Sequence, residues 1–417
     1  MKVRAQDVDV VRRLGEEYAA AASLGVHAER AELWRRLNDL APVRPLVWIN
    51  EIPWNELNVN DELTVRCEDD FCRGIESALR MVLYQWRHFP GDMILQPFFA
   101  CGKIWSSTGF GLSANVEYLD QDETTNIRAM RFTPAIVEAK DVEKIQTPRV
   151  TYDAAATEAN HQRMCELLGD ILPVRTTGMP TYWSCPADNV FMWFGLEQAM
   201  MDLVMRPEMV HEAMRRTVEG YLAELDQMEA LGLLECNNGP YRIGSGGFGH
   251  TGGLPQPAGD GRPARAIESW GCSAAQIFSD ISPRMHWEFV LQYEQRWLAR
   301  WGMTYYGCCE PLHRKMEILR RVPNLRKVSC SPQADAEMTA RQIGRDYVLS
   351  LKPNPAILAE NRWRPDQARR ELRENLERTR GCNVEIILKD ISTVRHKPER
   401  LWEWAAIASE LAEEFAP

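Results

Sequence analysis

The last third of the 417-residue chain repeats one pattern, a short apolar strand followed by a helix. Four such units follow one another, with strands expected at 303–308, 325–330, 347–351 and 384–388. The helices that follow them are expected at 312–321, 334–343, 366–379 and 398–414. Because parallel strands are joined by crossovers, usually helices, this pattern predicts a parallel sheet in an α/β protein.

The earlier part of the chain has a weaker version of the same alternation. Helices are expected at 7–39, 70–88, 191–205 and 207–231, short strands at 93–99, 171–177 and 233–237, and an irregular stretch at 42–60. No G-x-G-x-x-G follows a strand, and the repeat continues to the end of the sequence without a readable reversal. We therefore expect a single (β/α)8 TIM barrel at 91–417 with an N-terminal helical extension at 1–90 packed on it, and keep a doubly wound open sheet as the alternative.

The amino-acid composition limits which kinds of partner and which cellular location are expected for this protein. The chain has 49 Lys and Arg against 59 Asp and Glu, and no basic cluster suited to a phosphate backbone, so nucleic acid is not expected as a partner. No apolar run reaches 18 residues, and the first residues lack the apolar core of a signal peptide, so no membrane association is expected. Eleven cysteines without a disulfide spacing suggest reduced thiols in a cytoplasmic protein.

In a barrel, the catalytic groups follow the C-terminal ends of the strands. After the strand at 303–308, two thiols, a carboxylate and an imidazole lie within six residues: Cys308, Cys309, Glu310 and His313. Thiolate, carboxylate and imidazole are all zinc ligands. Strand alternation should turn only one of the two cysteines toward the centre, with Glu310 at the rim. The alternative is a buried thiol pair beside a glutamate that caps the next helix.

The next two strand ends carry Lys352 and the pair Lys389 and Asp390. A lysine at such an end can hold a substrate carboxylate, and a carboxylate beside it can act as a base. We expect both lysines to face one cavity. Their repulsion should lower the pKa of at least one, unless a substrate anion or a carboxylate lies between them.

A glycine-rich loop at 244–253 follows the strand at 233–237 and carries His250, with Asn238 and Arg242 just before it. We expect this loop to be mobile and to bring these three side chains to a small-molecule substrate, or else to be only a flexible surface loop. Trp183 and Tyr306 are aromatic candidates for the same site.

Several of these segments together resemble the uroporphyrinogen decarboxylase superfamily. They lie in the same order along roughly residues 90–410, at 186–203, 207–210, 307–312, 324–326, 331–332, 352–355 and 388–390. The resemblance implies a (β/α)8 barrel with one of two activities, decarboxylation of a porphyrinogen or zinc-dependent methyl transfer with a corrinoid protein.

The two activities make different demands on the sequence. The segment at 48–54 lacks the arginines with which the decarboxylase holds its substrate, and Tyr306-Gly307-Cys308 lacks the histidine of the coenzyme M type of methyltransferase. The resemblance then implies a divergent methyltransferase that moves a methyl group from a small ether or amine to cobalamin on a partner protein. Zinc would be held by a rearranged set from Cys308, Cys309 and His250, and Glu310 or the metal would activate the leaving group.

Two other functions stay open. Lys352, Lys389 and Arg242 would also suit a decarboxylase or lyase acting on a carboxylated small molecule. A binding protein could keep the barrel without its chemistry. The sequence also leaves a homodimer open.

Overall fold

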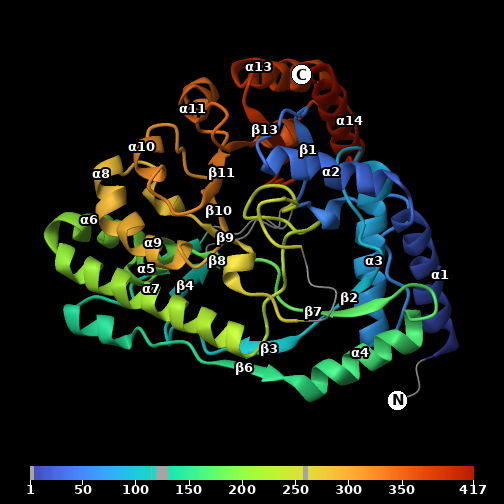
Figure 1. Ribbon diagram of the computed structural model, residues 1–417, viewed down its shortest axis with the longest axis horizontal. Coiled ribbons are helices and arrows are strands. Elements are labelled where there is room, and N and C mark those ends of the chain that lie inside the picture. Colours follow the sequence, from blue (N-terminus) through green and yellow to red (C-terminus); the bar gives the residue numbers. More distant parts are fainter. Residues whose placement is uncertain (1–3, 114, 119–129, 257–261) are drawn as a thin grey trace.

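The computed structural model describes residues 4–113, 115–118, 130–256 and 262–417. In these residues the largest sheet has seven strands, in the order β1-β13-β12-β11-β10-β9-β8, and every neighbouring pair is parallel (Figure 1). Its strands are β1 (Leu46–Ile49), β8 (Trp183–Ser184), β9 (Trp270–Ser273), β10 (Met303–Tyr306), β11 (Leu325–Cys330), β12 (Val348–Leu351) and β13 (Asn383–Leu388). The predicted parallel α/β architecture is confirmed.

The strand order runs in one direction from β8 to β13 and then returns to β1. A doubly wound sheet reverses its order in the middle, and this sheet has no such reversal. The first strand of the sequence pairs with the last, with Leu46 opposite Glu385. The expected boundary at residue 90 is therefore wrong, because β1 lies inside the supposed extension and belongs to the sheet. Strands β1 and β8 form the edges, and no ladder joins them within the described residues.

Three two-stranded ladders complete the strands. They are the parallel pair β2 (Phe99–Gly102) with β7 (Val174–Thr177), and the antiparallel pairs β3 (Ile104–Ser107) with β6 (Val150–Asp153) and β4 (Asn115–Tyr118) with β5 (Met130–Thr133). The strand expected at 93–99 is wrong, since only its last residue enters β2, and the one at 171–177 begins late, at Val174. The expected strand at 233–237 is reduced to one bridge, between Met179 and Leu234.

Helices surround the sheet. Those before β9 are α1 (Ala5–Ala22), α2 (Val26–Asn38), α3 (Asp70–His88), α4 (Ala154–Leu168), α5 (Pro186–Phe194), α6 (Leu196–Met205) and α7 (Pro207–Ala230). After β9 come α8 (Pro283–His286), a π-helical turn (Trp287–Leu291), α9 (Gln292–Leu298), α10 (Met316–Leu319), α11 (Ala336–Ile343), α12 (Ala356–Ala359), α13 (Pro365–Arg378) and α14 (Glu399–Glu414).

Local residues explain several helix ends. Helix α3 begins as predicted, because the Asp69 carboxylate accepts a hydrogen bond from the backbone N–H of Cys72. The expected helix at 7–39 is instead two helices, separated at residues 23–25, and the one at 191–205 breaks at Gly195, whose φ is 77°. The left-handed region costs glycine little, so the chain turns there.

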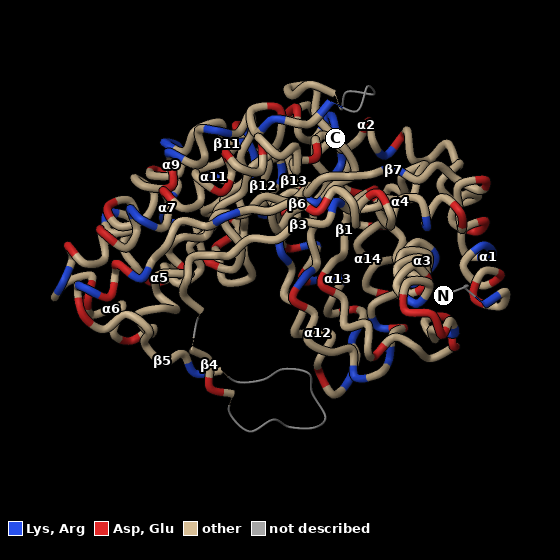
Figure 2. The backbone as a smooth tube through the Cα atoms, turned by 90° about the horizontal axis from the view of Figure 1, so that it is seen from below, with Lys and Arg blue, Asp and Glu red and all other residues tan. Residues whose placement is uncertain are grey.

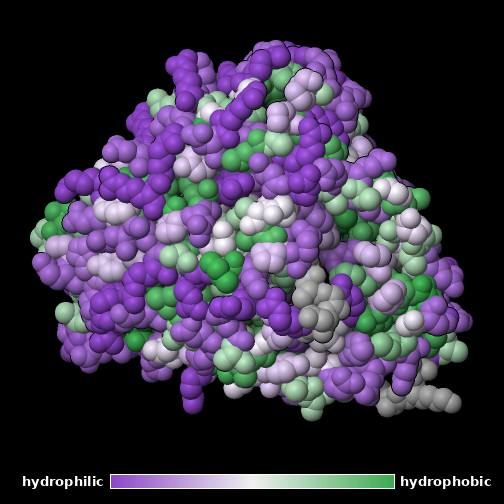
Figure 3. Space-filling model, in the orientation of Figure 1, coloured by the Kyte–Doolittle hydropathy of each residue, from purple (hydrophilic) through white to green (hydrophobic). Residues whose placement is uncertain are grey.

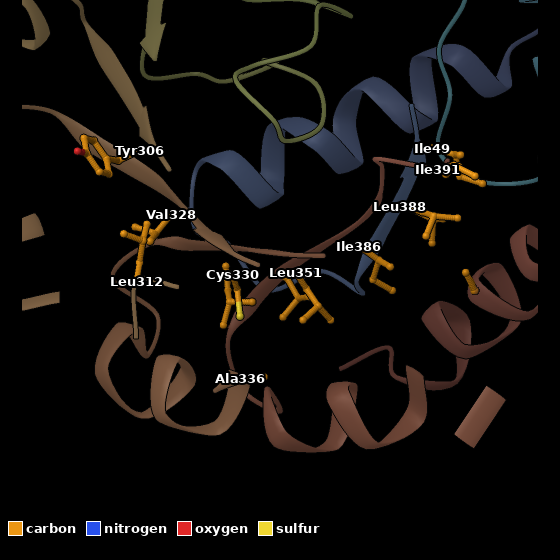
Figure 4. Close-up of a cluster of buried hydrophobic side chains, with 14 of the residues drawn as sticks. Ile49, Tyr306, Leu312, Val328, Cys330, Ala336, Leu351, Ile386, Leu388 and Ile391 are labelled. Atoms are coloured by element: carbon orange, nitrogen blue, oxygen red, sulfur yellow. The ribbon is translucent and has the colours of Figure 1, made fainter. Parts of the chain in front are cut away.

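One face of the sheet is apolar. Alternate residues of β10 to β13, among them Val328, Leu351, Ile386 and Leu388, pack with side chains of α10, α11, α13 and α14 (Figure 4). Burying one such side chain contributes about 1.5–3 kcal/mol. This layer fixes the strands, and therefore the positions of the residues at their ends.

The opposite, inner face is covered by the glycine-rich loop and by Trp34 of α2. Trp34 is buried with Phe248, Val348 and Ile387. A Cβ at Gly247 would lie 2.2 Å from the Trp34 ring, and one at Gly246 would lie 2.3 Å from Glu385 Oε1. Figure 1 shows this loop near the centre of the molecule. The predicted mobile loop is wrong, because residues 243–249 are buried. The glycines allow close packing here.

The outside of the molecule is polar and mixed in charge. The face seen in Figure 3 is mostly hydrophilic, and Figure 2 shows basic and acidic residues interspersed along the chain. Among the described residues, no helix has both the length and the apolar content needed to cross a bilayer.

Candidate functional site

The ends of β1, β10 and β13 bring five reactive side chains together. The Lys389 Nζ lies 3.6 Å from the Sγ of Cys308 and 3.7 Å from the Sγ of Cys309. It also pairs with Asp390, and lies 3.5 Å from Glu51 Oε2. We call these five residues the strand-end cluster. The sequence predicted four of its members, and the structure brings those four into contact.

Both thiols face the same ammonium group, so the expectation that the two would point in opposite directions is wrong. Strand alternation ends at Tyr306, and Gly307 follows with a φ of 99°. Beyond this turn the chain is no longer extended, and successive side chains need not alternate. The two sulfur atoms are 3.6 Å apart.

The thiol pair shares one negative charge. Cys308 accepts a hydrogen bond from Cys309. This bond, together with the charges of Lys389 and Lys352, lowers the pKa of Cys308 to about 6, although burial acts in the opposite direction. The same hydrogen bond raises the pKa of Cys309. Burial opposes the charge of Lys389, but Cys308, Asp390 and Glu51 outweigh it and raise the pKa of Lys389. Cys308 is therefore a thiolate at neutral pH, paired with an ammonium.

The outer edge of the cluster is more exposed. The Asp390 backbone N–H donates to Glu51 Oε2, and Glu51 Oε1 pairs with Arg242 at 2.6 Å. Asp390 has a φ of 55°, a conformation that costs a non-glycine residue energy and is often found at functional sites. Sequence reasoning missed Glu51, because it lies in the stretch taken as irregular. It lies two residues after β1, a strand that the sequence did not reveal, so the rule of strand ends could not be applied to it.

Lys352 lies inside the sheet, at the end of a chain of buried hydrogen bonds. Its Nζ donates to the Tyr305 hydroxyl at 2.6 Å and to Ser350 Oγ at 2.7 Å. Ser350 donates to Glu385 Oε1 at 2.6 Å, and Glu385 Oε2 pairs with Lys327 Nζ at 2.8 Å. We call these five residues the inner chain.

The two lysines follow neighbouring strands, as predicted, since β12 pairs with β13. Burial lowers the pKa of Lys352 to about 7, so the shift has the predicted direction, but burial and not repulsion from Lys389 is its main cause. Each lysine has a carboxylate close by, Asp390 for Lys389 and Glu385 through Ser350 for Lys352. The charges are therefore balanced by the protein, and no substrate anion is needed to balance them.

Three contacts show that the sheet curves. Lys389 follows β13 and touches residues after β10, Lys352 after β12 touches Tyr305 in β10, and Lys327 in β11 touches Glu385 in β13. The first contact crosses three strand spacings, about 14 Å in a flat sheet, and the other two cross two spacings. The first contact indicates a concave inner face.

Glu310 was expected at the rim, but it is fully buried, so this expectation is wrong. Its carboxylate accepts from the backbone N–H groups of Cys308 at 2.8 Å and Ala275 at 3.1 Å. The alternative expectation, a cap on the next helix, is also wrong, because α10 begins only at Met316. Burial raises the pKa of Glu310 to about 7. Glu310 fixes the loop that carries the two thiols.

Two predicted substrate ligands belong to this part of the chain, Asn238 just before the glycine-rich loop and His250 within it. The Asn238 side chain donates to the carbonyl oxygens of Thr251 and Leu254, both at 3.0 Å, so it holds the loop together. Burial lowers the pKa of His250 to about 4, and its Nε2 has no hydrogen-bond partner. Arg242, as described above, reaches the strand-end cluster through Glu51.

The two aromatic candidates differ. Tyr306 points to the outer face, where its hydroxyl contacts His286 Nε2 at 2.9 Å and donates to Glu294 at 3.1 Å. It cannot reach a ligand on the inner face, so its predicted role is wrong, and the neighbouring Tyr305 takes the inward position. The centroid of the Trp183 ring lies 6.4 Å from the centroid of the Tyr305 ring, and the two rings meet edge to face.

The predicted zinc ligands do not fit the metal. Within the described residues no group of three His, Cys, Asp or Glu side chains could hold a metal ion. The Lys389 ammonium lies against both sulfur atoms, and a zinc ion bound to the two thiols would have to displace this positive group.

No family model and no curated protein matches the chain. A solved structure shares its fold. It is a methyltransferase from Methanosarcina mazei, superposed with a TM-score of 0.51 over 92% of this chain and 98% of that one. The two sequences are 12% identical, so the likeness concerns the fold.

Proposed function

We propose that this protein is a methyltransferase that removes a methyl group from a small ether or amine and passes it to cobalamin on a partner protein. The observation that carries the proposal is a lysine with a pKa near 7 behind the strand-end cluster, at the place where barrel enzymes keep their catalytic groups. The likeness to a methyltransferase of known structure supports it. We further propose that the concave sheet is a (β/α)8 barrel of the uroporphyrinogen decarboxylase superfamily.

Ethers and amines are poor methyl donors because their leaving groups are strongly basic. A proton delivered to the oxygen or nitrogen as its bond to the methyl carbon breaks would lower this barrier. Lys352 is suited to this role, since its pKa of about 7 lets it give up a proton at neutral pH and regain one from water. Glu310 has a similar pKa, and both it and Lys352 are engaged in hydrogen bonds within the protein, so either group would have to release one of these bonds to reach a substrate.

The strand-end cluster would bind the substrate beside Lys352. Lys389 lies 3.6 Å from Cys308 Sγ, and the charge of Lys352 also lowers the pKa of this thiol. The corrinoid, held by the partner, would supply the electron pair that forms the new bond to the methyl carbon. No residue of this chain is assigned to hold it.

The test is a methyl-transfer assay with free cob(I)alamin as acceptor and a panel of methyl ethers and methylamines as donors. Lys352→Met should lower turnover by about 10²- to 10⁴-fold, the usual effect of losing an acid. Lys397→Met, at an exposed lysine, is the matched control. Circular dichroism should show both variants folded. The absence of transfer from every donor, or equal rates in the two variants, would contradict the proposal.

A decarboxylase or lyase is the second candidate. It is favoured by the two lysines at neighbouring strand ends and by Arg242 close to them, which suit a carboxylated substrate. Release of carbon dioxide from such compounds, without methyl transfer, would support it.

A further inference from the structure

We propose that Cys308 and Cys309 form a redox-active dithiol, which closes to a disulfide on reaction with a low-molecular-weight disulfide. This goes beyond the proposed function and does not depend on it. The starting observation is geometric: the two sulfur atoms lie 3.6 Å apart, and both face Lys389 Nζ. A disulfide bond is about 2 Å long, so rotation of the side chains has only a short distance to cover.

The pair is accessible. Both cysteines are half-buried, whereas Cys67, Cys72, Cys101, Cys272 and Cys330 are buried. The half-buried Cys236 makes a useful contrast, because its Sγ contacts the carbonyl oxygens of Pro255 and Glu268 at 3.8 and 3.9 Å. Access and a neighbouring thiol thus coincide at Cys308 and Cys309.

The surroundings provide each part of the exchange. Lys389 stabilises the Cys308 thiolate, which is the attacking form of a thiol. Cys309 Sγ lies 3.5 Å from Asp390 Oδ2, a carboxylate that can accept its proton. The loop that carries both residues is neither helix nor strand, so a small movement breaks no ladder.

The reaction has two steps. The Cys308 thiolate attacks one sulfur of the small disulfide, forms a mixed disulfide and releases one small thiolate. Cys309 then loses its proton to Asp390 and attacks Cys308 Sγ, which releases the second small thiolate. Two electrons pass from the cysteine pair to the small disulfide, which becomes two thiolates, and one of these takes up the proton from Asp390.

Reversibility follows from the adjacency of the two residues. Neighbouring Cα atoms are about 3.8 Å apart, closer than the roughly 4.4–6.8 Å usual for disulfides. A bond formed at this separation is strained and easily reduced. Its formation removes the thiolate that faces Lys389, so the charge of the strand-end cluster changes with the redox state.

The test uses the full-length protein and oxidised glutathione, followed by alkylation of the remaining thiols and mass spectrometry of the peptide 301–314. In the wild type, this peptide should lose two hydrogens, take up no alkylating agent and keep no glutathione, and dithiothreitol should restore both thiols. Cys309→Ser should stop at the first step and keep about tenfold more glutathione on Cys308 than the wild type, because no resolving thiol remains. Cys236→Ser is the matched control and should behave as the wild type.

Two results would overturn the proposal. One is a wild-type peptide in which both thiols can still be alkylated after the treatment. The other is a mixed disulfide on Cys308 that persists in the wild type beside a free Cys309. Both are read from the wild type alone, so a folding defect in a variant cannot produce them. Neither readout involves methyl transfer, so the result is separate from the test of the proposed function.

Discussion

The inner chain and the strand-end cluster both contain lysines and carboxylates, yet they hold them differently. In the inner chain, Glu385 and Lys327 have fully buried side chains and meet at 2.8 Å. In the strand-end cluster, Lys389 meets its thiols and Glu51 at 3.5–3.7 Å, and the side chain of Asp390 is 53% exposed. Removing a buried partner should cost stability, whereas removing a group at the exposed end should mainly change reactivity.

The largest effect should come from breaking the inner chain. Glu385→Gln leaves the Lys327 ammonium buried without a counter-charge, so we expect the free energy of unfolding to fall by about 3–5 kcal/mol. Urea denaturation measures this. The control is Glu410→Gln at the exposed pair with Arg369, which should cost less than about 1 kcal/mol. Similar losses in the two variants would show that burial does not distinguish these pairs.

Glu310 shares a property with each region. It is fully buried, as the inner chain is, but it supports the loop that carries the two thiols of the strand-end cluster. Its pKa is about 7 in the folded protein against an ordinary value of 4.5, so the folded state binds the proton more tightly. Its contribution to stability should therefore fall as the pH rises from 4.5 to 7, by on the order of 3 kcal/mol, and stay level above that.

Glu310→Gln should remove this dependence. The difference in unfolding free energy between wild type and variant, measured by urea denaturation from pH 4.5 to 8, should shift in favour of the variant up to about pH 7 and stay constant above it. Glu374→Gln, at an exposed glutamate, should differ from the wild type by a constant amount. A constant difference for Glu310→Gln as well would mean that the carboxyl group titrates normally.

The smallest effect should come from the strand-end cluster. Lys389→Met removes the cation beside Cys308, so the pKa of that thiol should rise from about 6 toward its ordinary value of 9. Alkylation of Cys308 by iodoacetamide at pH 7 should slow about tenfold, and the midpoint of its pH profile should move upward. Lys397→Met should leave the profile unchanged. An unchanged profile in Lys389→Met would show that the hydrogen bond from Cys309 alone holds the charge.

The sequence predicted the strands and most helices of the last third well, because each short apolar run there is followed by a clear helical pattern. Strand β11 matches the expected range, and β10, β12 and β13 differ by one or two residues at an end. Among the helices, α13 and α14 are within one residue of prediction, but α10 is much shorter than expected. The N-terminal strand was missed because Leu46–Ile49 is short and surrounded by prolines, and its partner lies more than 300 residues away.

The site was harder to predict than the fold. The order of the strands predicted that Cys308, Cys309, Lys389 and Asp390 would lie together, and their side chains are in contact, whereas their roles stay predictions. The errors at Glu310, Tyr306 and the glycine-rich loop concern burial and side-chain direction, which depend on packing between distant segments. Lys327 and Glu385 could have been found, since a charge inside a strand covered on both faces needs a buried partner.

The pairing of β1 with β13 also affects how the chain is made. Residues 46–49 leave the ribosome early, but the strand beside them is complete only at residue 388. Trp34 likewise cannot make its contacts with Val348 and Ile387 until those residues have been synthesised. During synthesis the N-terminal segment must therefore remain without its final neighbours, with apolar side chains exposed, until most of the chain has emerged. Contacts of such long sequence separation also form slowly, so we expect this protein to fold late and to depend on chaperones while it is being made.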